Sequence, residues 1–308
     1  MGSADDADPA AADSPTVGDP GPAPVVTYPT SIKAHLLGHS LMSKQADFLS
    51  YFASQTPGID FEFKEQNVPG ASLQFQLQVM RENTFVEYTP FDGAFDDVFG
   101  SESFDHFVMV ESVPRGDVVQ TLMDAQELVD MALAARPAAR TFFYEPWHCI
   151  NSGTDAGCAW DNGSATRNRR WVDRVAADGD MWRDVVRQIN SAMPASAEPM
   201  RFVPAATALA EAVTEARAGR VPGFSDIADF FIDDIHPNAY GLYVVACVHY
   251  AVLYGRAPVG QPVNVTGRWG DPEFGGSDRP APLTAQSARA LQQIAWDVAR
   301  AEPLTGVP

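Results

Sequence analysis

Apolar runs with the length of a strand alternate with stretches of helical spacing along most of this chain. Five runs fit strands, at 32–37, 59–65, 106–110, 140–144 and 200–204. Helical spacing follows them, at 42–53, 72–81, 117–135, 169–192, 205–218, 240–253 and 284–301. We expect Ser72 to cap its helix and the 169–192 helix to be interrupted near Gly179. Repeated strand–helix alternation predicts an α/β fold, with a parallel sheet and helices on both faces.

Several chemically useful residues directly follow predicted strands. They are Ser40, Gly70, Glu111, Trp147 and His148, while His236 precedes a strongly apolar helix. In open α/β sheets, ligands bind at the carboxyl ends of the strands. We therefore expect these residues to gather at one edge of the sheet.

Composition narrows the classes of partner. The 308 residues, 45% of them hydrophobic, are enough for one large core. The formal charge of −19 comes from 40 acidic and 21 basic residues, and such a surface repels nucleic acid. No apolar run reaches the ~18 residues that a membrane span needs.

The first 28 residues differ in composition from the rest. They are rich in Asp, Ala, Pro and Gly, show no signal-peptide pattern and open with Met-Gly-Ser, which is typical of a cloning remnant. We expect a disordered tether at 1–28 and a single domain at 29–308. Exported and lipid-anchored bacterial proteins often carry such a tether, so we expect a secreted or periplasmic protein, with a lipid anchor as a variant.

The chain has three cysteines. Cys149 and Cys158 flank a short Gly-containing loop, and either a disulfide or two unpaired thiols is consistent with the sequence. Cys247 lies in an apolar helical stretch and is interpreted as a buried small hydrophobe.

The segment around Ser40 is the first candidate for chemistry. The apolar strand ends at Gly38, and Ser40 follows where a helix is predicted to begin. A Ser at such a turn exposes its hydroxyl near free backbone N–H groups, which suits a nucleophile. The alternative is that Ser40 only caps the helix, a common role for Ser.

The second candidate segment is Asp233-Asp234-Ile235-His236-Pro237. A carboxylate three residues before a His can hold one imidazole nitrogen while the other faces a nucleophile. Asp234 is out of phase, and we expect it to face solvent or cap the helix. An ordinary surface loop is the alternative interpretation. Taken together, the two segments supply a nucleophile, a base and an orienting acid.

These segments resemble motifs of the SGNH hydrolases, also called the GDSL esterase/lipase superfamily. Residues 37–41 are similar to the first motif, with His39 where Asp is usual, and residues 233–241 are similar to the last. Residues 68–72 fit the second motif. The resemblance covers about 32–255 and implies a three-layer α/β/α sandwich, flavodoxin-like, with a five-stranded parallel sheet. It also implies Ser40 as nucleophile, His236 as base, Asp233 as its orienting acid, and backbone oxyanion donors at Ser40 and Gly70.

The third motif of that superfamily, Gly-x-Asn-Asp, is missing. Its Asn supplies a third oxyanion donor, whereas here Glu111 and Ser112 follow the strand. Loss of one such donor costs on the order of 100-fold in rate. Ser112, Asn151 or His148 is a candidate substitute. Glu111 either binds a substrate hydroxyl, structures the site or is a solvated loop residue.

Trp147 and His148 are candidate substrate-binding residues. A Trp at a strand end can stack on a sugar ring or an acyl chain, and the alternative is a Trp that closes the core. The following loop, which ends near Gly163, carries several oxygen ligands, but their spacing is not that of an EF-hand. No metal or organic cofactor is expected.

The resemblance leads us to expect a serine esterase acting on carboxylic esters, with short acyl groups on carbohydrates, such as O-acetyl groups, as the first choice. The alternative is a non-catalytic or weakly active relative that binds an acylated glycan, which the missing Asn favours. A metal-assisted hydrolase centred on 147–163 is a third interpretation. The partner in each case is a small-molecule or glycan ester.

Overall fold

The computed structural model describes residues 28–82, 104–113, 118–158, 165–263 and 283–308. Five strands form one parallel sheet in the order β2-β1-β3-β4-β5. Their bounds are β1 (Ser31–Gly38), β2 (Asp60–Asn67), β3 (His106–Val110), β4 (Arg140–Tyr144) and β5 (Arg201–Val203). This is the flavodoxin-like order, with its switch point between β1 and β3. The predicted α/β fold with a five-stranded parallel sheet is confirmed.

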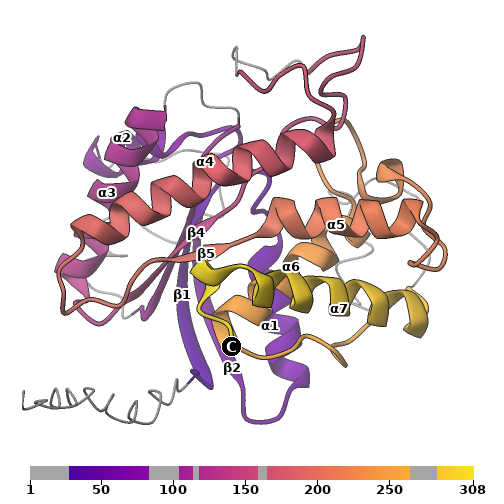
Figure 1. Ribbon diagram of the computed structural model, residues 1–308. Coiled ribbons are helices and arrows are strands. Elements are labelled where there is room, and N and C mark those ends of the chain that lie inside the picture. Colours follow the sequence, from indigo (N-terminus) through magenta and orange to yellow (C-terminus); the bar gives the residue numbers. More distant parts are fainter. Residues whose placement is uncertain (1–27, 83–103, 114–117, 159–164, 264–282) are drawn as a thin grey trace, which may run out of the picture.

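Helices cover both faces of the sheet (Figure 1). One face carries α2 (Leu73–Glu82), α3 (Val118–Ala135) and most of α4 (Trp171–Ala192). The other carries α1 (Gln45–Gln55), α5 (Ala205–Arg217), α6 (Ala239–Tyr254) and α7 (Ala285–Ala301). Two short 3₁₀ helices, η2 (Ile227–Phe230) and η4 (Pro303–Thr305), were not predicted.

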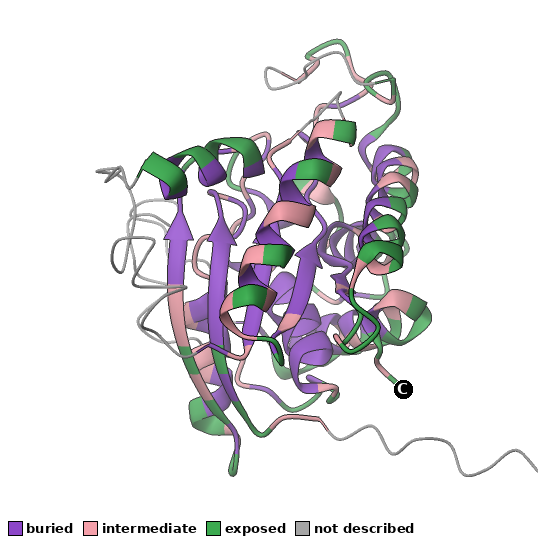
Figure 2. Ribbon diagram, turned by 90° about the vertical axis from the view of Figure 1, so that its left-hand side faces the viewer, coloured by how far each residue is buried: buried purple, intermediate pink, exposed green. Residues whose placement is uncertain are grey.

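Strand β3 is mostly apolar because helices cover the sheet on both faces. Every residue of β3 is buried, with Val108 facing one core and Phe107 the other. A strand covered on both faces reads as a continuous apolar run, as the sequence does here. Figure 2 shows the strands buried toward their carboxyl ends and the exposed residues on the outward sides of the helices.

Two predicted helices differ in detail from the structure. The first was expected from Met42 but begins at Gln45, because Lys44 before it takes a left-handed conformation with φ 71°. The long helix α4 is not interrupted at Gly179. A Cβ there would lie 2.8 Å from Nη1 of Arg183 and 2.9 Å from Oε1 of Glu145, so this glycine makes room for two polar side chains.

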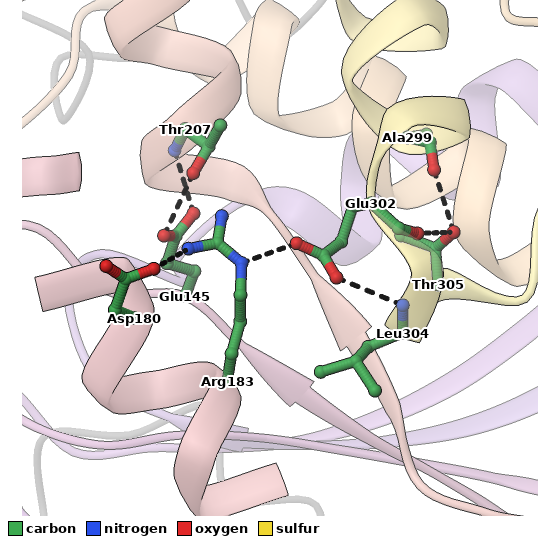
Figure 3. A network of polar contacts seen from close by, with 8 residues as sticks. All are labelled: Glu145, Asp180, Arg183, Thr207, Ala299, Glu302, Leu304 and Thr305. Carbon is green, nitrogen blue, oxygen red and sulfur yellow. Dashed lines mark hydrogen bonds and ion pairs between the residues drawn. The ribbon is translucent and has the colours of Figure 1, made fainter. Parts of the chain in front are cut away.

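Those two side chains belong to a polar network that holds the C-terminus to the sheet (Figure 3). Glu145 directly follows β4, is fully buried, and accepts hydrogen bonds from the N–H (2.8 Å) and hydroxyl (3.0 Å) of Thr207. Arg183 donates to Glu302, whose other oxygen accepts the N–H of Leu304 at 3.0 Å. Hydrogen bonds thus join β4 to α5 and α4 to the last turn of the chain, and the charge of Arg183 attracts the Glu145 carboxylate between the two parts.

Several predictions fall outside the described residues. Positions 1–27 of the expected tether do, as do most of the stretches 84–104 and 256–283, in which no helix or strand was predicted. Tyr28 was assigned to the tether, but its hydroxyl donates to the carbonyl of Gly306 at 2.8 Å, so it packs with the domain. Across the described ranges, none of the helices has the length and apolar character that crossing a bilayer requires.

Buried histidines make the fold sensitive to acid. His35, His39 and His249 are all buried, and burial lowers their pKa values from 6.5 to about 3, about 4 and about 4. The folded protein therefore keeps these rings neutral at a pH where the unfolded chain binds protons. Glu145 acts in the opposite sense, because burial raises its pKa to about 7.

We expect the free energy of unfolding to be highest above pH 6.5 and to fall as the pH decreases from 6.5 toward 4, since three histidines outweigh one carboxyl group. Urea unfolding at pH 7.5, 6 and 5 measures this. The variant His35→Phe, which keeps a ring stacked on Phe107, should show a shallower pH dependence. A free energy that is constant over this range would contradict the prediction.

Candidate active site

Ser40 lies in a turn at the carboxyl end of β1. The strand ends at Gly38, where a Cβ would come 2.6 Å from Cγ1 of Val110 and 3.0 Å from Sδ of Met42. Only glycine fits this approach, so the chain can turn sharply beside β3. Ser40 is half-buried and precedes α1 by five residues, so it does not cap that helix. Helix capping, the alternative interpretation of Ser40, is thereby removed.

The loop before α6 brings His236 to Ser40. The Ser40 Oγ lies 3.0 Å from Nε2 of His236, and Nδ1 of the same ring lies 2.7 Å from Oδ2 of Asp233. These partners select the tautomer in which Nδ1–H donates to Asp233 and Nε2 accepts the Ser40 hydroxyl. Three residues predicted from two distant segments are thus brought into one hydrogen-bonded line.

The Asp233 carboxylate also shapes its own loop. Its Oδ1 accepts the backbone N–H groups of Ile235 (2.8 Å) and His236 (2.6 Å). Partial burial raises the pKa of Asp233, but the two N–H groups and the His236 ring outweigh it, so the pKa lies below the ordinary value. The carboxylate therefore stays ionised and holds the ring through neutral pH.

Two N–H donors from the segment after β4 hold this loop in place. Trp147 Nε1–H donates to the carbonyl of Ile235 at 2.9 Å, and the N–H of Ile150 donates to the carbonyl of Asp234 at 2.7 Å. Between these two donors lies Cys149, which forms a disulfide with Cys158. The segment after β4 thus clamps two consecutive carbonyls just before His236.

The predicted substrate-binding roles of Trp147 and His148 are corrected by their burial. Trp147 is 1% exposed, and its indole supports the loop described above. His148 is 4% exposed, with Nε2 2.9 Å from Oδ2 of the buried Asp178. Neither side chain reaches the groove beside Ser40. The core-closing alternative for Trp147 agrees with the structure, and His148 is directed into α4 rather than toward an oxyanion.

Glu111 is also corrected as a substrate-binding residue. It is completely buried, and its carboxylate accepts hydrogen bonds from the backbone of Leu73, the hydroxyl of Thr121 and both donors of Ser112. The alternative that Glu111 structures the site agrees with these contacts. Because its N–H and O–H both donate to Glu111, Ser112 is not available as the third oxyanion donor.

Gly70 lies in the turn after β2. Its φ of +69° is the left-handed conformation that favours glycine, and no heavy atom lies within 4 Å of the position of a Cβ. The turn is tied to the end of β1, because the N–H of Val68 donates to the carbonyl of Gly38 at 2.9 Å. The turns that carry Ser40 and Gly70 are therefore directly joined.

A groove of about 280 Å³ opens beside Ser40 and His236. Its other lining residues are Ser43, Lys44, Ile232, Pro237 and Leu242. The sequence reasoning missed four of these, although Ile232 immediately precedes Asp233 and is 45% exposed, which is unusual for isoleucine. The groove presents an apolar wall from the loop before α6 and a polar wall from the turn before α1.

Across the part of the chain that the structure describes, no three His, Cys, Asp or Glu side chains are grouped so that they could hold a metal ion. The oxygen-rich positions 161–163 lie outside the described residues.

Neither the models of known protein families nor the curated proteins gave a match to this chain. Among solved structures, it is similar to a DUF4886 family protein from Bacteroides uniformis, with TM-score 0.62 and 16% identity over 90% of this chain and 100% of that one. It also matches a putative SGNH hydrolase from Slackia heliotrinireducens (TM-score 0.41, 18% identity, 70% of this chain and 95% of that one). An acetyl xylan esterase gives TM-score 0.44 and 12% identity, covering 70% of this chain and 96% of that one.

The first of these likenesses shows the fold and nothing further. Together with the sheet order, it agrees with the predicted α/β fold built on a five-stranded parallel sheet.

Gly241 should be essential for the position of the loop before α6. A Cβ there would lie 2.4 Å from the carbonyl oxygen of Phe230 and 2.8 Å from Cβ of Pro237. Gly241→Ala should therefore lower the free energy of unfolding by about 1–3 kcal/mol. The matched variant Gly179→Ala should cost less, because its new Cβ meets only the ends of flexible side chains. Urea unfolding of both variants checks this, and native stability of Gly241→Ala would contradict it.

The disulfide should contribute measurably to stability. The double variant Cys149→Ser/Cys158→Ser should lose about 2–3 kcal/mol, because a covalent link across nine positions no longer restricts the unfolded chain. Dithiothreitol should lower the free energy of unfolding of the native protein by a similar amount and leave that of the double variant unchanged. If native protein with fully reduced thiols unfolds at the same urea concentration as the oxidised form, the prediction is wrong.

Proposed function

We propose that this protein is a serine esterase that hydrolyses carboxylic esters through an acyl-enzyme. The observation that carries the proposal is the hydrogen-bonded line from Ser40 through His236 to Asp233, with contacts of 3.0 Å and 2.7 Å. A Ser hydroxyl becomes a competent nucleophile when a neutral imidazole can take its proton. The resemblance of residues 37–41, 68–72 and 233–241 to motifs of the SGNH hydrolases supports the same reaction class.

In the first half of the reaction, the Ser40 Oγ attacks the ester carbonyl carbon while His236 Nε2 takes the hydroxyl proton. Asp233 stabilises the imidazolium that forms. The N–H groups of Ser40 and Gly70 stabilise the oxyanion. When the tetrahedral intermediate collapses, the C–O bond to the alcohol breaks, and His236 returns the proton to the leaving alcohol.

In the second half, His236 takes a proton from water as the water oxygen attacks the acyl-enzyme. Collapse of this second intermediate releases the carboxylic acid and restores the Ser40 hydroxyl. Proton transfer runs between water and these side chains alone.

The groove supports a short acyl group as the preferred substrate part. A volume of about 280 Å³ lies at the low end for a small-molecule site, and its apolar wall of Ile232, Pro237 and Leu242 suits a few methylene groups. Structural neighbours include an acetyl xylan esterase and an esterase active on acetylated mannans. We therefore propose short acyl esters, with O-acetyl groups on carbohydrates as the first class to test.

The alternative is a relative that binds an acylated glycan without turning it over. The absence of Asn after β3 favours it, because the oxyanion then has no side-chain donor in that position. For either function, the Cys149–Cys158 disulfide supports our proposal of a secreted or periplasmic protein, since disulfides persist in oxidising compartments.

The test is hydrolysis of p-nitrophenyl acetate, butyrate and octanoate. Ser40→Ala should lower kcat by roughly 10³-fold or more, because the nucleophile is gone. Ser54→Ala, on the exposed side of α1, should leave kcat unchanged, and a chelator should have no effect. Acetate and butyrate should be hydrolysed faster than octanoate. Turnover that survives Ser40→Ala but stops with chelator would indicate the metal-assisted mechanism, and absence of turnover would favour the glycan-binding alternative.

A further inference from the structure

Glu111 is the most heavily hydrogen-bonded carboxylate near Ser40. It directly follows β3 and is 0% exposed. Its oxygens accept from the N–H of Ser112 (2.7 Å), the hydroxyl of Thr121 (2.8 Å), the hydroxyl of Ser112 (3.1 Å) and the N–H of Leu73 (3.2 Å). Four donors nearly fill the acceptor capacity of a carboxylate, so Glu111 holds its surroundings rather than a ligand.

The donors come from the starts of two helices. Leu73 is the first residue of α2, and Thr121 lies in the first turn of α3. A helix N-terminus favours a negative charge, because its first N–H groups have no partner within the helix. Since Leu73 follows Gly70 by three residues, the carboxylate fixes the start of α2 and with it the turn that carries Gly70.

The backbone carbonyl of the same residue holds the other turn. Nε2–H of His39 donates to the carbonyl oxygen of Glu111 at 3.0 Å, and Nδ1 accepts the N–H of Leu41 at 3.4 Å. His39 and Leu41 flank Ser40. The ring of His39 therefore fixes the residues on both sides of Ser40 and ties them to Glu111. The ring is buried, and burial lowers the pKa of His39 to about 4, which keeps this tautomer neutral.

We propose that Glu111 is a positioning residue that sets the distance between the two backbone donors of the oxyanion hole, the N–H groups of Ser40 and Gly70. Its carboxylate holds the Gly70 turn, and its carbonyl holds the Ser40 turn through His39. The inference rests on the proposed esterase function. It assigns a role to the strand end from which the third donor is missing: two rigidly spaced N–H groups act where related enzymes use three donors.

Direct contacts between the Ser40 turn and the Gly70 turn also help to fix the distance between them. The carbonyl of Gly38 accepts from the N–H of Val68 at 2.9 Å and from Nε2 of Gln76 at 2.6 Å. Gln76 is completely buried, and its Oε1 accepts in turn from Gln66 at 2.6 Å. The two bonds of Gln76 therefore tie α2 both to the end of β1 and to β2.

The decisive variant is Glu111→Gln. The amide has the same shape, but its NH₂ group is a donor that faces donors from Ser112, Thr121 or Leu73. We expect kcat for p-nitrophenyl acetate to fall roughly 10- to 100-fold, with KM within about threefold of native, since oxyanion donors act mainly in the transition state. The inhibition constant of phenylboronic acid, which forms a tetrahedral adduct with Ser40, should rise by a similar factor.

Glu145→Gln is the matched control. Glu145 also follows a strand directly, is also 0% exposed, and also accepts a backbone N–H and a Thr hydroxyl, but its donors come from α5 (Figure 3). The charged group that attracts it is Arg183, which donates to Glu302 near the C-terminus. It should lose stability without a comparable loss of kcat. If both variants lose kcat in proportion to stability, or if folded Glu111→Gln turns over like the native protein, the inference is wrong.

A second pair covers the case in which Glu111→Gln does not fold. Thr121→Val and Thr207→Val each remove one hydroxyl donor, to Glu111 and Glu145 respectively. Only Thr121→Val should lower kcat, by a smaller factor than Glu111→Gln. Equal kcat in the two variants would overturn the inference.

A fluorophosphonate separates the inference from the proposed function. Ser40 Oγ attacks phosphorus, the P–O bond forms, fluoride leaves and His236 takes the hydroxyl proton, all without ester turnover. If the native protein hydrolyses no ester but is labelled at Ser40, and Thr121→Val or Glu111→Gln slows labelling, the inference holds while the esterase proposal fails. Absence of labelling in the native protein would overturn both.

Discussion

The geometry of the site depends on how an irregular loop is held against a rigid sheet. Ser40 and His236 are 196 positions apart, and the 3.0 Å contact between them exists only because residues 231–238 keep one conformation. That loop contains no helix, so its backbone polar groups need partners from elsewhere. Trp147 and Ile150 supply two of them, and Asp233 supplies two more from within the loop. The geometry of the candidate active site therefore depends on hydrogen bonds within the loop as well as on donors from the segment after β4.

Buried carboxylates with similar hydrogen bonds lie at two neighbouring strand ends. Glu111 after β3 and Glu145 after β4 are both fully buried carboxylates, and each accepts from a helix-borne Thr and from backbone N–H groups. Burial of an acid is costly unless such donors surround it, so each carboxylate fixes the start of the helices that satisfy it. At β3 the carboxylate holds the start of α2, next to the turn that carries Gly70. At β4 the carboxylate holds the start of α5 and lies near Arg183, which donates to Glu302 close to the C-terminus. The same arrangement of a buried carboxylate therefore supports the candidate active site at Glu111 and the packing of helices at Glu145.

The contacts explain how the sequence departs from the SGNH motifs that it resembles. With Glu111 where an Asn-bearing segment is usual and His39 where Asp is usual, the two substitutions meet directly, since the His39 ring donates to the Glu111 carbonyl. Each residue looks anomalous when read alone. Together they form one connection between the turn that carries Ser40 and the end of β3, which gives the pair a structural reason that neither position reveals by itself.

The sequence by itself determined the parallel sheet, the edge of the sheet at which the candidate active site lies, and the residues that meet there. Strand and helix periodicity is local, and parallel strands bring their carboxyl ends to one edge, so β3 and β4 were predicted with the bounds they have, and Ser40, Asp233 and His236 were predicted to converge. Only the tertiary structure decided what Glu111, Trp147 and His148 contact, whether Cys149 pairs with Cys158, and why Gly179 is tolerated within α4. Each of these depends on partners distant in sequence, and burial turns a polar side chain at the sheet edge from a ligand contact into a support for the backbone around it.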